Sequence, residues 1–177
     1  MNGKNTAKNI AKSALFTLLM VVCAYIKVPI LTVPLTFQLA VAILSGFFLG
    51  AWWGAFSMLA YCLLGLVGLP VFAYGGGVAY VMNPSFGYIL GFVLSSAFCG
   101  LFKDKCNKFS SYLILSLIAL VVGYVVGIIY FTIIWLTVYG EGFFYALAIY
   151  NLIYIPKDVI ICILTSVIAN KSALIIK

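Results

Sequence analysis

Apolar residues run along this chain in long blocks, separated mainly by short stretches that contain glycine, proline, asparagine or lysine. A bilayer-spanning helix needs about 20 predominantly apolar residues, with about 17 at the lower end. Blocks of this length predict membrane-spanning helices, and the glycine and proline positions between them predict turns. The pattern indicates an all-α polytopic membrane protein, with residues 1–177 forming one transmembrane domain.

Charge does not divide the first half of the chain, because Lys27 is the only charged residue between Lys12 and Lys103. Glycine and proline positions predict spans at residues 10–26, 37–50, 53–69 and 86–102, with an inner turn at residues 50–54. One helix over residues 37–70 would be about 50 Å long against a hydrocarbon core of about 30 Å. Two spans are therefore expected there.

Lysine positions predict the orientation of this bundle. Two further spans, at residues 112–138 and 143–169, follow the mid-chain lysines. If the terminal and mid-chain lysine groups all lie in the cytoplasm, an even number of spans must separate each group from the next. Six spans satisfy this condition, so we expect a six-helix bundle with both termini cytoplasmic. Its outer loops would be residues 27–36, 70–84 and 139–142.

Composition agrees with lipid as the main solvent. The chain is 66% hydrophobic and 7% charged, with a mean hydropathy of +1.26, whereas soluble chains carry about a quarter charged residues. The net charge of +7 comes from lysines at the ends of apolar blocks, which argues against a nucleic-acid-binding face. The five cysteines are scattered singly, as expected for reduced thiols. No small-residue cleavage site follows the first apolar block, so we interpret this block as a span and not as a signal peptide.

Catalytic motifs are missing from the sequence. It has no histidine, no GxSxG, no paired-carboxylate motif and no phosphate-binding loop. We therefore expect a binding protein with no cofactor and no enzymatic activity, and any active transport would take its energy from a partner.

Asp158 is the strongest candidate for a binding residue. A carboxylate within a spanning segment costs about 2.5–3.5 kcal/mol on insertion scales and normally faces the bundle interior or a cavity. If the helix restarts at Pro156, Asp158 falls in its first turn, where the helix dipole favours negative charge. The alternative is a structural role, in which Asp158 pairs with Lys157 or reaches the outer interface.

Further candidates lie in the predicted outer loops and at the outer ends of the spans. Glycine lets the backbone approach a ligand, amide side chains both donate and accept, and lysine attracts carboxylates. The alternatives are a flexible turn for the glycines, a turn opener for Asn-Pro, a helix–helix contact for glutamine, snorkelling for lysine and an aromatic belt for tyrosines. The candidates are Gly75, Gly76, Gly77, Asn83, Thr36, Gln38, Lys27, Lys157, Tyr80, Tyr88 and Tyr154.

Five segments together carry a resemblance to one family. They are VPLTFQ at 33–38, LSGFFLGAWWGA at 44–55, GLPVFA at 68–73 followed by GGG, PSFGYILGF at 84–92, and IPKD at 155–158. In this order and spacing they resemble the BioY family, the substrate-capturing S components of energy-coupling-factor (ECF) transporters for biotin. The resemblance covers nearly the whole chain.

This resemblance implies a six-helix S component in the bacterial cell membrane that binds biotin near the outer face. It implies that Asp158 contacts the polar ring system, that the glycine-rich loop and Asn83 hold the bicyclic head, and that residues 27–38 close over the site. Lys27 or Lys157 would attract the valerate carboxylate. A membrane coupling protein with two ATPases would supply the energy.

Two alternative functions stay open at the level of sequence. One is an S component for another small carboxylate, such as lipoate or a biotin precursor. The other is a non-transport membrane protein, either a small channel or a structural subunit of a larger complex.

Overall fold

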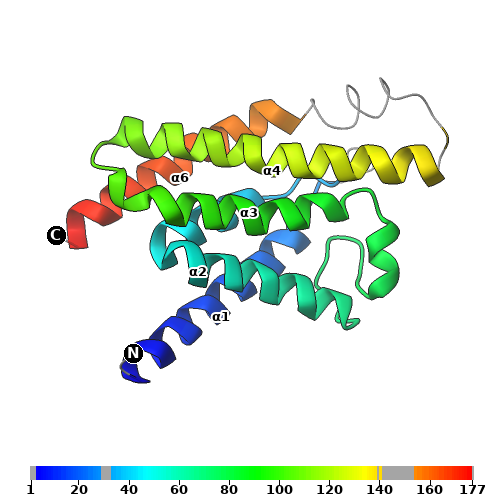
Figure 1. Ribbon diagram of the computed structural model, residues 1–177, viewed down its shortest axis with the longest axis horizontal. Helices are drawn as coiled ribbons and strands as arrows, with labels where there is room; N and C mark the ends of the chain where they lie inside the picture. Colours follow the sequence, from blue (N-terminus) through cyan, green and yellow to red (C-terminus); the bar gives the residue numbers. More distant parts are fainter. Residues whose placement is uncertain (1–2, 29–32, 139, 141–153, 177) are drawn as a thin grey trace.

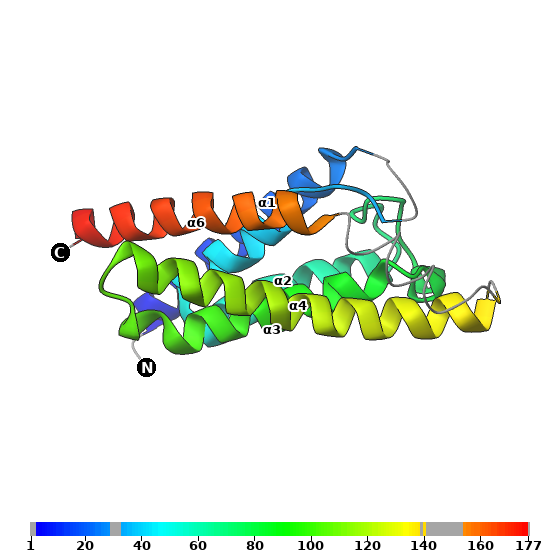
Figure 2. The same cartoon turned by 90° about the horizontal axis from the view of Figure 1, so that it is seen from above.

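The structure is a computed structural model that describes residues 3–28, 33–138, 140 and 154–176. Its helices lie side by side along one direction, as Figures 1 and 2 show. Both chain ends and the η2 turn lie at one end of the bundle, which we call the lysine end. The connection of residues 67–85 lies at the opposite end, the loop end. The described elements are α1 (Gly3–Tyr25), α2 (Gln38–Leu66), η1 (Val78–Met82), α3 (Phe86–Phe102), η2 (Lys103–Lys105), α4 (Phe109–Val138) and α6 (Ile155–Ile176).

The element α2 reverses direction at Gly50. This residue has φ 83° and ψ 177°, a conformation that is essentially restricted to glycine. A Cβ atom built on Gly54 would lie 3.0 Å from the carbonyl oxygen of Ser45, whereas residues nine apart in a straight helix are separated by about 13 Å. Residues 38–49 and 51–66 therefore form two helical arms that fold against each other. The predicted break is confirmed, but the turn needs one residue and not the whole segment 50–54.

The helix ends differ from the predicted bounds, except in α3, which has the expected bounds. α1 begins at Gly3 and not at residue 10, α4 begins at Phe109 and not at 112, and α6 continues to Ile176 beyond residue 169. Hydropathy marks the apolar part of a helix, whereas backbone hydrogen bonding continues into the polar turns beyond it. Residues 143–153 of the last predicted span lie outside the described residues.

α2 ends earlier than predicted, at Leu66 and not at residue 69, because Gly68 adopts φ 111°. The Gly68 N–H donates to the Gly65 carbonyl and the Leu69 N–H donates to the Leu64 carbonyl. This pair of bonds is the Schellman arrangement that closes a helix C-terminus.

Among the residues that the structure describes, four helices are long and apolar enough to cross a membrane: Thr6–Tyr25, Gln38–Leu66, Phe86–Lys105 and Phe109–Val138. One face of α4 shows why lipid suits this bundle, because apolar side chains recur there every three or four residues and are exposed. They are Ile114, Ile118, Val121, Val125, Ile129 and Ile133. An outward apolar stripe of this kind is stable against acyl chains and not against water. The protein is a multi-pass membrane protein.

Small residues hold the interior helices close together. α3 packs against both α2 and α4, and α6 packs against α4 and α2. A Cβ on Gly91 of α3 would lie 2.6 Å from the Gly123 carbonyl oxygen of α4, so a larger residue would push these helices apart. The hydroxyls of Ser45 and Ser96 form a buried hydrogen bond of 2.7 Å between α2 and α3. Close approach and interhelical hydroxyl contacts are typical of membrane bundles. All five cysteines are free thiols, as predicted.

Candidate binding site

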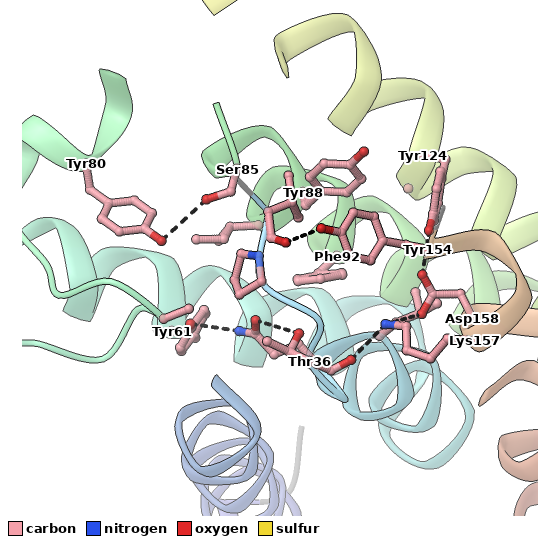
Figure 3. Close-up of a pocket in the computed structure, with 17 residues that line it drawn as sticks. Thr36, Tyr61, Tyr80, Ser85, Tyr88, Phe92, Tyr124, Tyr154, Lys157 and Asp158 are labelled. Atoms are coloured by element: carbon pink, nitrogen blue, oxygen red, sulfur yellow. Dashed lines mark hydrogen bonds and ion pairs between the residues drawn. The ribbon is translucent and has the colours of Figure 1, made fainter. Parts of the chain in front are cut away.

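A cavity opens at the loop end of the bundle, between α2, α3, α4 and α6, and Figure 3 shows its lining. Its wall is mostly aromatic and aliphatic, with a small number of polar groups that face one another, as is usual for small-molecule sites. The described part of the chain contains no group of three or more side chains suited to a metal ion. The lining residues are Val33, Pro34, Thr36, Gln38, Leu39, Tyr61, Ala73, Tyr80, Ser85, Tyr88, Ile89, Phe92, Gly123, Tyr124, Tyr154, Lys157 and Asp158.

Asp158 is the charged centre of this cavity. It lies in the first turn of α6, as the proline at position 156 predicts, and is 5% exposed. The Tyr124 hydroxyl donates to its Oδ2 atom at 2.5 Å, and the Lys157 ammonium lies 2.6 Å from its Oδ1 atom. Within the described residues Oδ1 has this ion pair but no hydrogen bond of good geometry. The carboxylate therefore keeps acceptor capacity on the cavity side.

The start of α6 also holds the segment that leads into α2. The Lys157 ammonium donates to the Thr36 carbonyl at 2.9 Å, and the Tyr154 hydroxyl donates to the Val33 carbonyl at 2.5 Å. These bonds join residues 121 positions apart in sequence. Lys157 therefore acts on two groups at once, since the same nitrogen also pairs with Asp158.

A chain of buried hydrogen bonds forms the second polar part of the wall. The Thr36 hydroxyl donates to Gln38 Oε1 at 3.2 Å, and Gln38 Nε2 donates to the Tyr61 hydroxyl at 2.8 Å. Tyr61 in turn donates to the Val71 carbonyl at 3.1 Å. Figure 3 draws the part of this chain that runs from Thr36 to Tyr61. The chain fixes the Gln38 amide, which keeps one free N–H at most.

Aromatic rings complete the cavity. Tyr88 of α3 meets Tyr124 of α4 edge to face, with ring centres 5.7 Å apart, and Gly127 leaves the space in which Tyr88 lies. Tyr80 of η1 is 8% exposed, with its hydroxyl 3.4 Å from that of Ser85. Burial raises the pKa of Tyr80, so its hydroxyl stays neutral and keeps its proton at physiological pH.

The sequence-predicted candidates divide into two groups. Seven line the cavity: Asp158, Lys157, Gln38, Thr36, Tyr80, Tyr88 and Tyr154. The other five, which are Asn83, Lys27, Gly75, Gly76 and Gly77, are not part of its lining. Asn83 accepts from the backbone N–H and the hydroxyl of Ser85, in the turn that opens α3.

Lys27 and the glycine run organise the loop end beside the cavity. The Lys27 ammonium donates to the Ala73 carbonyl and lies 4.7 Å from the centre of the Tyr74 ring. The Gly77 N–H donates to the Gly65 carbonyl at 2.7 Å, and a Cβ on Gly76 would lie 2.0 Å from the Leu69 carbonyl oxygen. The glycines therefore let the loop pack against the end of α2.

Sequence reasoning did not single out Tyr61, Tyr124 or Ser85. Tyr61 and Tyr124 lie within long apolar helices, where a phenol hydroxyl that is buried needs a hydrogen-bond partner. Because such a partner is found inside the bundle and not in the lipid, both tyrosines are expected to face the interior. Nothing in the sequence, however, indicates that the partner of Tyr124 is Asp158, which is 34 residues away.

A sequence model of the BioY family matches residues 1–176. The chain belongs to the BioY family. It is 40% identical over 119 residues to the probable biotin transporter BioY of Lysinibacillus sphaericus, an alignment that covers 66% of this chain and 61% of that protein. It is 37% identical over 122 residues to the biotin transporter BioY of Thermotoga maritima, covering 68% and 72% of the two chains.

A solved structure supports the same family at the level of the fold. The fold is similar to that in the crystal structure of the S-component for biotin from an ECF-type ABC transporter, with a TM-score of 0.84 and 27% identity. The match covers 98% of this chain and 94% of that one. The resemblance carried by the five sequence segments is thereby confirmed.

Proposed function

We propose that this BioY-family protein is the biotin-binding S component of an ECF-type biotin uptake transporter. The observation that carries the proposal is the buried carboxylate of Asp158, paired with Lys157 and facing an aromatic cavity. The names of the relatives and of the structural neighbour support biotin as the ligand. The protein is a transporter subunit and not an enzyme.

The Lys157–Asp158 pair suits one edge of a cyclic urea. The ureido ring of biotin presents a carbonyl acceptor beside an N–H donor, and the pair presents an ammonium donor beside a carboxylate acceptor, 2.6 Å apart. Asp158 would accept the ureido N–H and Lys157 would donate to the ureido oxygen. The tyrosines and Phe92 would pack on the fused rings.

This arrangement places the valerate carboxylate away from Lys157. A second carboxylate beside Asp158 would be repelled, because like charges in a poorly hydrated site interact strongly. Lys27 is the better partner, since its ammonium already contacts the carbonyl of cavity-lining Ala73 at the loop end. Asn83 and the glycine run would act indirectly, by shaping the loop around the bound head.

Binding would require the cavity wall to adjust. The cavity has a volume of about 60 Å³, which is room for a few water molecules. A ligand as large as biotin would move the tyrosine rings or the Lys157 side chain outward. This movement would disturb two hydrogen bonds, from Tyr154 to the Val33 carbonyl and from Lys157 to the Thr36 carbonyl.

The proposed topology has six spans with both termini in the cytoplasm. Within the described part of the chain, the two arms of α2 together with α1, α3, α4 and α6 make six helices, and the reversal at Gly50 supports the proposed count. The lysine end would face the cytoplasm by the positive-inside bias, which puts the cavity on the outer side. A membrane coupling protein and two ATPases would supply the energy.

Calorimetric titration of biotin into the purified protein tests the site. Asp158→Asn removes the charge at nearly constant volume, and Asp104→Asn is the matched control because Asp104 lies in η2 at the lysine end. Hydrogen bonds to charged groups contribute about 1.5–3 kcal/mol, so Asp158→Asn should weaken binding roughly 10- to 150-fold. Equal affinities for the two variants would refute the assignment.

Competition experiments test the ligand chemistry. Desthiobiotin keeps the ureido ring, whereas lipoate has a carboxylate and no urea. Desthiobiotin should displace labelled biotin, and lipoate should not. If lipoate and desthiobiotin displace biotin equally well, the Lys157–Asp158 pair does not recognise the ureido ring.

A further inference from the structure

A second cavity lies at the lysine end, far from the candidate biotin site. Its volume is about 430 Å³, and it opens between α1, α2, η2, α4 and α6. The two cavities share no lining residue. The second is lined by Lys12, Phe47, Phe48, Lys103, Asp104, Tyr112, Ala169, Ser172 and Ala173.

Two lysines reach this cavity from different elements. Lys12 comes from α1, and Lys103 comes from η2. The Lys103 ammonium would lie 3.6 Å from a Cβ built on Gly50, so its side chain extends over the turn between the arms of α2. Asp104, the carboxylate of the lining, is exposed at the rim. The positive charge of the cavity therefore exceeds its negative charge.

Apart from Ser172, the remaining walls are aromatic or apolar and lead toward the lipid. Phe47 and Tyr112 pack edge to face, with ring centres 5.3 Å apart. Ala169 and Ala173 of α6 have short side chains, which keeps the space open. Phe48 is 37% exposed, so one wall of the cavity continues onto the outer apolar surface.

A cationic space with an apolar exit, at the ends of membrane-spanning helices, matches an amphipathic anion. Headgroup phosphates lie at this depth of a bilayer, and basic pockets between helices on the cytoplasmic side bind anionic lipid headgroups. We propose that this cavity binds an anionic phospholipid, with the phosphate between Lys12 and Lys103 and an acyl chain beside Phe48. The inference depends on the proposed orientation of the lysine end and not on biotin binding.

Lipid titration of the detergent-purified protein, followed by native mass spectrometry, tests this proposal. The probes are phosphatidylglycerol, phosphatidylcholine and inorganic phosphate. Phosphatidylglycerol should bind wild type more tightly than the other two. The double variant Lys12→Gln/Lys103→Gln should bind it about 30-fold more weakly, since each lysine near the surface contributes about fivefold.

The control is Lys105→Gln/Lys108→Gln, which removes the same charge from the same end of the bundle but outside the lining. It should keep nearly wild-type affinity for phosphatidylglycerol. Thermal unfolding of the same samples in detergent reports whether each variant folds, and Lys12→Gln alone replaces the double variant if that one does not.

Three outcomes would overturn the proposal. Equal affinities for phosphatidylglycerol and phosphatidylcholine would show that the cavity does not select an anionic headgroup. Equal binding of inorganic phosphate would make it a site for a free anion and not for a lipid. An equal loss in the control variant would mean that net charge, and not this cavity, attracts the lipid. None of these outcomes tests the proposed biotin site, because the two cavities share no lining residue.

Discussion

Replacing Lys157 by methionine tests the electrostatics of the site through the stability of the fold. Methionine keeps an unbranched apolar stem but removes the ammonium. That ammonium lies 2.6 Å from Asp158 Oδ1 and donates to the Thr36 carbonyl at 2.9 Å. Lys157→Met therefore leaves a carboxylate side chain that is 7% exposed without its counter-ion and also releases the segment before α2.

The magnitude follows from the burial of the pair. At an effective dielectric constant of about 20, charges 2.6 Å apart attract by about 6 kcal/mol, and desolvation of both groups offsets most of this. Removing one partner of a buried pair costs about 3–5 kcal/mol. Because the Lys157 side chain is 23% exposed and Tyr124 still donates to Asp158, we expect the lower end, about 3 kcal/mol. For a chain of this size the melting temperature should fall by about 6–12 °C.

A double-mutant cycle followed by thermal unfolding in detergent measures this effect. Lys157→Met/Asp158→Asn should be more stable than Lys157→Met, because the second change removes the unpaired charge. Lys171→Met is the matched control, since Lys171 is an exposed lysine on the same helix, and it should melt within about 1–2 °C of wild type. The pair does not stabilise the folded protein if Lys157→Met has the same melting temperature as wild type. The same conclusion follows if Lys157→Met/Asp158→Asn has a lower melting temperature than Lys157→Met.

Two further predictions concern the ligand and the topology. Lys27→Met should weaken biotin binding about fivefold, because a part-exposed ion pair contributes about 1 kcal/mol. It should also abolish the preference for biotin over biotinamide in the same titration. An unchanged preference would mean that a residue other than Lys27 binds the valerate carboxylate. In a chain whose five native cysteines are replaced, an impermeant maleimide applied to intact cells should label Val78→Cys, which is 73% exposed at the loop end, and spare Asn107→Cys between η2 and α4. The reverse labelling would invert the proposed orientation.

Local patterning predicted most of the helices, because bilayer thickness and backbone hydrogen bonding act on contiguous residues. The glycines and prolines marked the break in α2, the bounds of α3 and the first turn of α6, which contains Pro156. The unusual chemistry of Asp158, a carboxylate within an apolar block, also singled it out without any structure. Such features depend on neighbours in the chain and can be read directly from it.

The partners of these residues depended on tertiary contacts. Tyr124 meets Asp158 because α4 packs on α6, and Gln38 meets Tyr61 because Gly50 folds the two arms of α2 together. Beside the cavity at the loop end, Lys27 and Asn83 bond to neighbouring loop residues and do not line the wall.

What the sequence by itself determined is therefore the solvent, the helices and the family of this protein, since hydropathy, turn residues and spaced motifs are local properties. Only the tertiary structure decided which side chains meet. Those contacts join residues many positions apart, and their geometry depends on how closely glycine and serine allow the helices to approach. The hydrogen bond from Tyr124 to Asp158 in an aromatic cavity, and the separate cationic cavity at the lysine end, both arise at that level.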